Sequence, residues 1–141
     1  MYAVVRLRGS AALRKDIKDT LSMLRLHRKM HCVILKDDNI NKGMLQKVRN
    51  WITYGEINDD ILKYLIEKRG RKLGNKRLKK EEVEEALKKL KEEGKVPKTI
   101  KPIFRLSPPS KGFKKSTKQH YPEGELGYRG EKINELLKRM I

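Results

Sequence analysis

Short apolar runs and amphipathic stretches alternate along the first 57 residues of the chain. Apolar residues recur at every second position over 2–8, which predicts a strand with one buried face and one partly cationic face that carries Arg6 and Arg8. The helical spacing of apolar residues further along predicts amphipathic helices over 13–24 and 43–50. This part of the chain therefore alternates between strand and helix.

Two further apolar runs, over 31–36 and 51–57, have the β-favouring composition of strands. The order strand–helix–strand–helix–strand, with short links, predicts a compact α/β core over 1–57. Two helices on one face of a three-stranded sheet would bury all of these apolar stripes. Ser10 precedes the first helix and is a candidate N-cap, because a serine hydroxyl can accept from the first backbone N–H groups of a helix.

Residues 58–141 have a different pattern and are predicted to form an extension of this core. Asn58 as N-cap and Gly70 as stop mark the two ends of a helix. A second amphipathic helix follows and ends at Gly94, so that residues 58–94 form a helical hairpin. Its apolar stripes predict that the hairpin packs on the core.

Residues 101–121 form a basic arm between this hairpin and a C-terminal helix over 131–141. The arm contains six Lys or Arg residues and no acid, and its prolines together with Gly112 exclude a regular helix. Its aromatic side chains are Phe104, Phe113, His120 and Tyr121. Cations on an extended backbone can follow phosphates while rings stack on exposed bases, so a nucleic-acid-binding arm is favoured over a segment that only adds solubility.

The charge of the whole chain supports this interpretation. The 141 residues include 36 Lys and Arg against 18 Asp and Glu, which gives a formal net charge of +18. Such an excess repels itself in a compact protein and indicates an anionic partner, with nucleic acid first and a membrane surface second. Lys- and Glu-rich heat-stable proteins also carry many cations, so the uneven distribution of the charge is the stronger argument.

A second basic feature lies where a helical pattern changes into a strand, within residues 24–35. We call residues 25–31 the corner; its cationic side chains are Arg25, His27, Arg28 and Lys29. Cations between two packed elements are carried on rigid supports, as a site for a phosphate-rich partner requires. Further cations on the same small core, at Lys47 and Arg49, add to this surface.

Chemistry beyond binding finds little support in the sequence. Cys32 is the only cysteine, which excludes a disulfide within the chain and suits a reducing compartment. It is expected to be a small buried residue, since the three histidines and one cysteine lack the spacing of a metal site. No nucleophile–base grouping or glycine-rich phosphate loop stands out, so we expect neither catalysis nor a cofactor. With no secretory signal and no apolar run of about 20 residues, a cytoplasmic protein is expected.

Several motifs resemble, in one order, the family of the universal large-subunit ribosomal protein thirty, whose eukaryotic counterpart is numbered seven. Within the core they cover 20–31, 42–49 and 52–57. Residues 104–113 and 124–134 resemble the archaeal and eukaryotic branch of that family, which indicates the archaeal type. Together these motifs span nearly the whole chain.

The resemblance implies a ferredoxin-like, three-stranded antiparallel sheet with the first strand central and two helices on one face. It also implies a structural, non-enzymatic constituent of the large ribosomal subunit that binds ribosomal RNA, beside neighbouring ribosomal proteins and without a small-molecule substrate. A free-standing RNA- or DNA-binding regulatory protein is the alternative, with the hairpin as a helix-turn-helix, but the many glutamates of its second helix would repel DNA phosphates. A membrane-surface role is disfavoured, because the arm is not an amphipathic helix.

We therefore predict one set of RNA-binding residues, drawn from the core, the corner, the arm and the motif before the last helix. They are Arg6, Arg8, Arg25, His27, Arg28, Lys29, Lys47, Arg49, Arg105, Lys111, Phe113, Lys114, Lys115, Lys118 and Arg129.

Overall fold

A computed structural model covers the chain and describes all residues except 10–12, 73, 75 and 94–99. The elements are β1 (Tyr2–Arg6), α1 (Lys15–Met23), β2 (His31–Leu35), α2 (Asn39–Lys47), β3 (Ile52–Glu56), α3 (Asp59–Arg69), α4 (Lys80–Glu93), β4 (Phe104–Arg105), β5 (Ser116–His120), β6 (Gly124–Tyr128), the 3-10 turn η1 (Gly130–Lys132) and α5 (Ile133–Met140). Ser10 and Gly94, predicted as a helix cap and a helix end, lie outside the described residues.

Three antiparallel strands form the centre of the fold. β1 pairs with β2, where Val5 lies opposite Cys32, and on its other side with β3, where Arg6 lies opposite Ile52. α1 and α2 cover one face of these strands, and Leu21 and Leu45 are buried there in one apolar cluster. The predicted α+β class and the ferredoxin-like arrangement, with a central first strand and two helices on one face, are confirmed.

The extension enlarges this sheet to six strands among the described residues, in the order β4-β2-β1-β3-β6-β5. β4 pairs antiparallel with β2, and β6 pairs parallel with β3. Both ends of the basic arm thus belong to the sheet, because β4 and β5 lie within residues 101–121. The sequence predicts the arm as extended, but not that it supplies these two edge strands.

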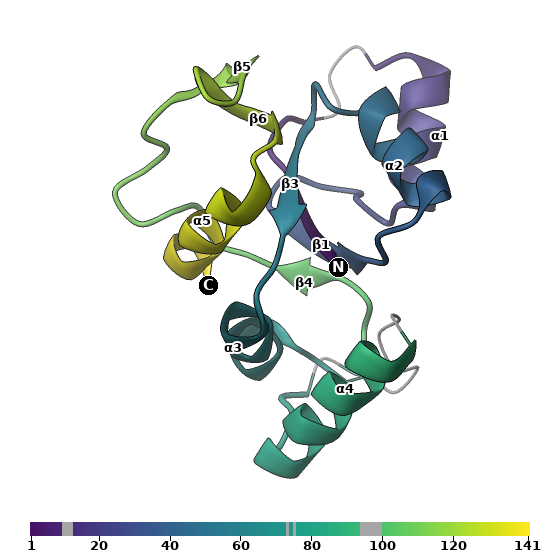
Figure 1. Cartoon of the computed structure of the whole chain (residues 1–141), viewed down its shortest axis with the longest axis vertical. Helices are drawn as coiled ribbons and strands as arrows, with labels where there is room; N and C mark the ends of the chain where they lie inside the picture. The colour runs from purple at the N-terminus through teal and green to yellow at the C-terminus, as the bar shows by residue number, and fades with distance from the viewer. Residues whose placement is uncertain (10–12, 73, 75, 94–99) are drawn as a thin grey trace.

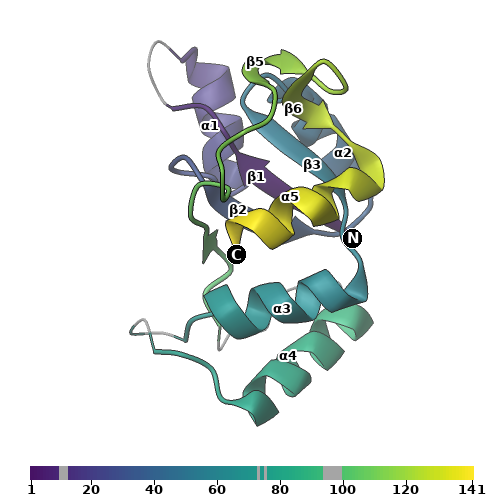
Figure 2. The same ribbon diagram turned by 90° about the vertical axis from the view of Figure 1, so that its left-hand side faces the viewer.

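The second face of the sheet is covered as well, by α5 and α3 (Figures 1 and 2). A second apolar cluster joins Ala3 and Val5 of β1 to Leu65 of α3 and Leu137 of α5. All five residues of β1 are therefore buried. The partly cationic face expected for this strand is therefore buried. Arg6 lies on the same face as Val4, which packs against α1 and α2, whereas the extension covers the opposite face.

The helix ends follow local capping chemistry. α2 begins four residues earlier than predicted, because the Asp38 side chain accepts a hydrogen bond from the Asn41 backbone N–H at 2.8 Å. The predicted cap of α3 is confirmed, since Asn58 accepts from the Ile61 N–H at 2.9 Å. Gly70 ends α3 as predicted.

The predicted hairpin is formed by α3 and α4, which pack side by side at the end of the molecule seen lowest in Figure 2. Val83, Ala86 and Leu90 of α4 belong to the same apolar cluster as the second face of the sheet. The division into 1–57 and 58–141 stays a prediction, and one cluster crosses that boundary. Within the described residues, no helix is both long and apolar enough to cross a bilayer.

Candidate nucleic-acid interface

One end of the sheet collects cations from distant parts of the sequence. β1 ends at Arg6, which lies opposite Ile52 at the start of β3. Val5 lies opposite Cys32, so the start of β2 is at the same end of the sheet. β4 adds Arg105 directly opposite His31. We call this the basic end; it lies at the end of β1 away from the N-terminus. Its exposed basic side chains are Arg25, His27, Arg28, Lys29 and Arg105.

Arg6 lies beneath this surface and connects β1 to the corner. Its Nη1 donates to the Leu26 carbonyl at 2.7 Å, and its Nε donates to the Arg8 carbonyl at 2.8 Å. The Arg6 carbonyl in turn accepts from the Met30 N–H at 2.7 Å. The residue is only 2 % exposed, and this burial lowers the pKa of its guanidinium. Arg6 is thus a positioning residue for the corner and lies beneath its exposed surface.

The corner turns sharply because two of its residues adopt left-handed backbone conformations. Arg25 has a φ of 62° and Met30 a φ of 65°, which is costly for residues with a Cβ atom. The turn is fixed by a hydrogen bond from the Leu26 N–H to the Leu21 carbonyl at 2.9 Å. The Met30 carbonyl accepts from the Leu106 N–H at 3.0 Å, so the start of the arm is also attached to the corner.

His31 is half-buried among these cations. Burial is the first cause that lowers its pKa, followed by the positive charges of Arg105, His27 and Arg28. The imidazole is therefore neutral near pH 7. Its neighbour Cys32 is fully buried, and desolvation raises the pKa of its thiol to about 12. The prediction that Cys32 is a buried core residue is confirmed.

The far end of the arm returns to the same end of the sheet. His120 forms a hydrogen bond of 2.6 Å between its Nε2 and Oδ1 of Asn50. Arg8 donates from Nη1 to the Asn50 carbonyl at 3.3 Å, and its guanidinium lies 5.9 Å from the centre of the Trp51 ring. Trp51 is half-buried at the edge of the core. Lys47 and Arg49 are exposed nearby in sequence, at the end of α2.

The middle of the arm lies along α5. The Ser107 N–H donates to the Met140 carbonyl at 3.2 Å, and the Ser110 N–H donates to the Arg139 carbonyl at 3.1 Å. The Arg139 guanidinium donates back to the carbonyls of Ser110 and Gly112. The arm is therefore attached to a packed helix, and its exposed lysines are carried on an ordered backbone. They are Lys111, Lys114, Lys115 and Lys118.

A buried ionic network connects the arm to the sheet. Arg129 Nη2 donates to Glu125 Oε2 at 2.6 Å, and both side chains are only 6 % exposed. Arg129 Nε donates to Thr53 Oγ1 on β3 at 2.7 Å. The second carboxylate oxygen of Glu125 accepts from the Lys115 N–H at 3.0 Å. One carboxylate thus positions β6, β3 and the arm relative to one another.

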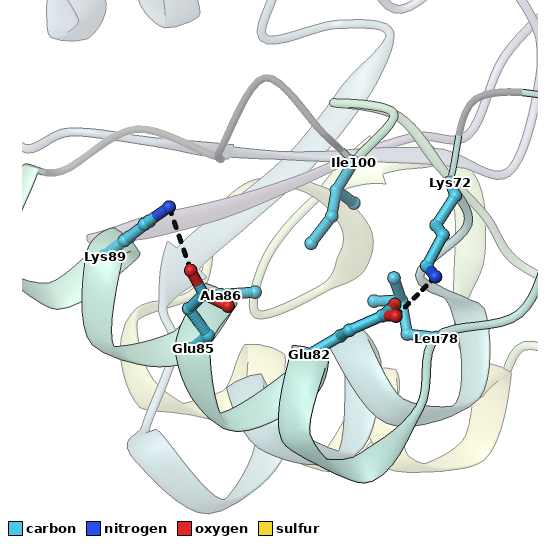
Figure 3. Close-up of a pocket in the computed structure, with 7 residues that line it drawn as sticks. All are labelled: Lys72, Leu78, Glu82, Glu85, Ala86, Lys89 and Ile100. Atoms are coloured by element: carbon cyan, nitrogen blue, oxygen red, sulfur yellow. Dashed lines mark hydrogen bonds and ion pairs between the residues drawn. The ribbon is translucent and has the colours of Figure 1, made fainter.

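Among the cavities of the described residues, one of about 310 Å³ lies against α4 (Figure 3). Ile100, Leu78 and Ala86 form its apolar part. Its charged side chains form two ion pairs, Lys72 with Glu82 and Lys89 with Glu85. Since these charges balance, the cavity has no preference for an anion.

Comparison with known proteins agrees with this architecture. The sequence profile described as ribosomal protein L30p/L7e matches residues 2–52. The large ribosomal subunit protein uL30 of Staphylothermus marinus is 47 % identical over 159 aligned positions, which cover all of this chain and 98 % of the relative. The uL30 proteins of Archaeoglobus fulgidus and Methanococcus maripaludis are 46 % and 50 % identical, with 99 % of each chain covered. The chain belongs to the uL30 family. This confirms the resemblance found in the motifs, and the uL30 similarity covers the extension as well as the core.

The predicted RNA-binding residues of this uL30 chain divide by exposure. Most are exposed: Arg25, His27, Arg28, Lys29, Lys47, Arg49, Arg105, Lys111, Lys114, Lys115 and Lys118. Arg8 and Phe113 are half-buried, and Phe113 packs against the apolar cluster beneath the arm. Arg6 and Arg129 are buried, and their guanidinium groups donate to protein oxygens. RNA contact by all of these residues stays a prediction.

Two residues that shape this surface are absent from the sequence-based set. Glu125 is a carboxylate four residues before Arg129, a spacing that indicates an ion pair on a helix. Because Glu125 lies in the strand β6, that rule does not apply to it. Arg139 lies in the last turn of the C-terminal helix, where a cation is expected to interact with helix carbonyls. Its actual acceptors are on the arm, which no local pattern indicates.

Proposed function

We propose that this chain is a structural constituent of the large ribosomal subunit, where it binds ribosomal RNA beside neighbouring ribosomal proteins and carries out no reaction itself. The observation that carries the proposal is the basic end, on which exposed cations of the corner lie next to Arg105 of the arm. Full-length relatives are named large ribosomal subunit protein uL30, and this agrees with such a role.

The two basic surfaces would act in different ways. The corner presents cations from a backbone fixed by Arg6, so it can bind phosphates only at fixed separations. The arm presents exposed lysines along a non-helical backbone and can follow the path of an RNA strand. Neutralised phosphates release counterions, which favours binding and makes it sensitive to salt. Together the surfaces would fix RNA segments relative to one another.

The first test measures the affinity of the purified chain for large-subunit ribosomal RNA over a range of salt concentrations. We expect the logarithm of the affinity to fall with the logarithm of salt, by about 0.7–0.9 for each phosphate that is neutralised. A flat salt dependence contradicts the electrostatic mechanism. Co-sedimentation with the large subunit, lost only at high salt, is expected for a structural constituent, whereas preference for one duplex DNA sequence would favour a free-standing regulator.

The second test separates the arm from general positive charge. A variant with Gln in place of four arm lysines, Lys111, Lys114, Lys115 and Lys118, removes four charges. Its matched control replaces four exposed lysines in or beside α4, namely Lys79, Lys80, Lys88 and Lys89. If all four arm lysines contact phosphates, the slope falls by about 3, while the control changes it little. Equal losses in both variants would mean that the arm has no special role.

A further inference from the structure

A second cavity, of about 260 Å³, lies between the basic arm, β6 and α5. We call it the arm pocket. Its charged lining consists of the cations Lys114, Lys115, Arg129, Lys132 and Arg139 and the carboxylates Glu125 and Glu135. It therefore has a surplus of three positive charges, in contrast to the balanced cavity of Figure 3.

The surplus belongs to three particular side chains. Arg129 is paired with Glu125 at 2.6 Å, and Lys132 is paired with Glu135 at 3.5 Å. Arg139 donates to arm carbonyls, and Lys115 Nζ donates to the Pro122 carbonyl. Carbonyl oxygens orient a cation without neutralising its charge. The last pocket cation, Lys114, is exposed and forms no ion pair within the described part of the chain.

The walls of the arm pocket are ordered before any ligand binds. The Lys115 backbone is fixed by Glu125 Oε1, which accepts its N–H at 3.0 Å. The half-buried Tyr121 ring has Lys115 Nζ at 5.1 Å and the Arg129 guanidinium at 5.7 Å from its centre. An anion that enters such a site does not have to order these groups, so little of the binding free energy is lost to their conformational entropy.

We propose that the arm pocket binds one phosphate group of an RNA backbone through Lys114, Lys115 and Arg139. This inference rests on the proposed function and makes it specific, because it adds Arg139 and a discrete, partly enclosed phosphate site to the surface described above. A cavity of about 260 Å³ is just below the roughly 300–1,000 Å³ of small-molecule pockets, so it can admit a phosphate with part of its sugar but not the edge of a duplex.

The main experiment compares single-charge variants in the salt dependence of binding to large-subunit RNA. Lys114→Gln and Arg139→Gln are each expected to lower the slope by about 0.7–0.9, the value for one phosphate contact. Lys138→Gln, on α5 beside Arg139 but outside the pocket lining, removes the same charge and is expected to leave the slope nearly unchanged. An equal change of slope in all three variants would contradict a phosphate site in the arm pocket, but it would not contradict RNA binding by the chain.

Two further measurements complete the test. Arg139→Lys keeps the charge and is expected to recover most of the slope, whereas a loss equal to that of Arg139→Gln would assign Arg139 to fixing the arm alone and overturn its phosphate contact. Amide NMR shifts of Lys114 and Lys115 are then followed with inorganic phosphate and with a short oligoribonucleotide. The oligonucleotide is expected to bind more tightly than inorganic phosphate. Tighter binding of inorganic phosphate would contradict the proposal that the bound phosphate belongs to an RNA backbone. Complete absence of RNA binding by the unmodified chain would instead contradict the proposed function.

Discussion

Substitution of Glu125 by Gln tests the buried network that connects the arm to the sheet. The change keeps the shape of the side chain but removes the negative charge beside Arg129, where both side chains are only 6 % exposed. A glutamine also has one acceptor oxygen where the carboxylate has two, so it cannot accept from both Arg129 and the Lys115 N–H. The substitution thus removes both the counter-ion of Arg129 and one hydrogen-bond acceptor.

The size of the effect follows from the groups that remain. Removing one partner of a buried ion pair costs about 3–5 kcal/mol, because an uncompensated charge is left in the interior. Arg129 keeps the Thr53 hydroxyl and the Glu125 backbone carbonyl as acceptors, at 2.7 and 2.5 Å. We therefore expect a loss near the lower limit, about 3 kcal/mol in the free energy of unfolding.

Urea unfolding followed by circular dichroism measures this loss, and hydrogen exchange of the Lys115 amide reports whether the arm detaches. Glu135→Gln is the matched control, since its pair with Lys132 has side chains that are 75 % and 61 % exposed. The control is expected to lose less than about 1 kcal/mol. Equal losses in the two variants would refute the assignment of the network. A Glu125→Gln, Arg129→Met double variant that recovers part of the loss would identify the unpaired charge as its cause.

Three further outcomes follow from local geometry. Gly55→Ala should lower the free energy of unfolding in urea by about 1–3 kcal/mol, because the added Cβ would lie 2.0 Å from a carbonyl oxygen of η1. Gly43→Ala is the control: its Cβ would meet open space, so this change should be neutral or stabilising. Arg25→Gly should be more stable than Arg25→Gln by about 1 kcal/mol in the same assay, because both remove the charge but only glycine relieves the left-handed backbone. Tyr128 donates to the Glu56 carboxylate, and this hydrogen bond is the first cause that raises the pKa of the phenol from 10.0 to about 12, followed by desolvation. The phenol should therefore ionise near pH 12 by ultraviolet absorbance, and at a lower pH after Glu56→Ala. Since the unfolded state loses this proton first, the stability that Tyr128 contributes is present below pH 10 and is lost between pH 10 and about 12.

The secondary structure of the core was predictable because its signals are local. The two-residue and helical periods, with caps such as Asn58 and stops such as Gly70, depend on residues only a few positions apart. The start of α2 was misplaced for a local reason too, since either Asp38 or the residues after it could have capped the helix. Errors of this kind shift an element without changing the fold.

The pairings made by the extension were not predictable in the same way. β4 has only two residues, and its register opposite His31 depends on where residues 58–103 bring the chain back to the sheet. Burial of Arg6 has a different cause, because its face of β1, shared with Val4, packs against α1 and α2 and its guanidinium donates to the Leu26 carbonyl of the corner. Proximity of the corner to Arg105 is therefore a result of the fold that no local pattern contains.

The positions of the arginines explain why counting cations overstates the RNA-binding surface. A guanidinium carries five donors in a planar fork, so one side chain can connect several backbone or carboxylate oxygens, as Arg6 and Arg129 do. A lysine ammonium is a compact, strongly hydrated charge that is less suited to such links, and four of the arm lysines, at positions 111, 114, 115 and 118, stay exposed. The net charge of +18 thus mixes cations that build the surface with cations that are able to contact phosphate. Because only phosphate contacts contribute to the salt dependence of affinity, its slope measures the second group separately from the first.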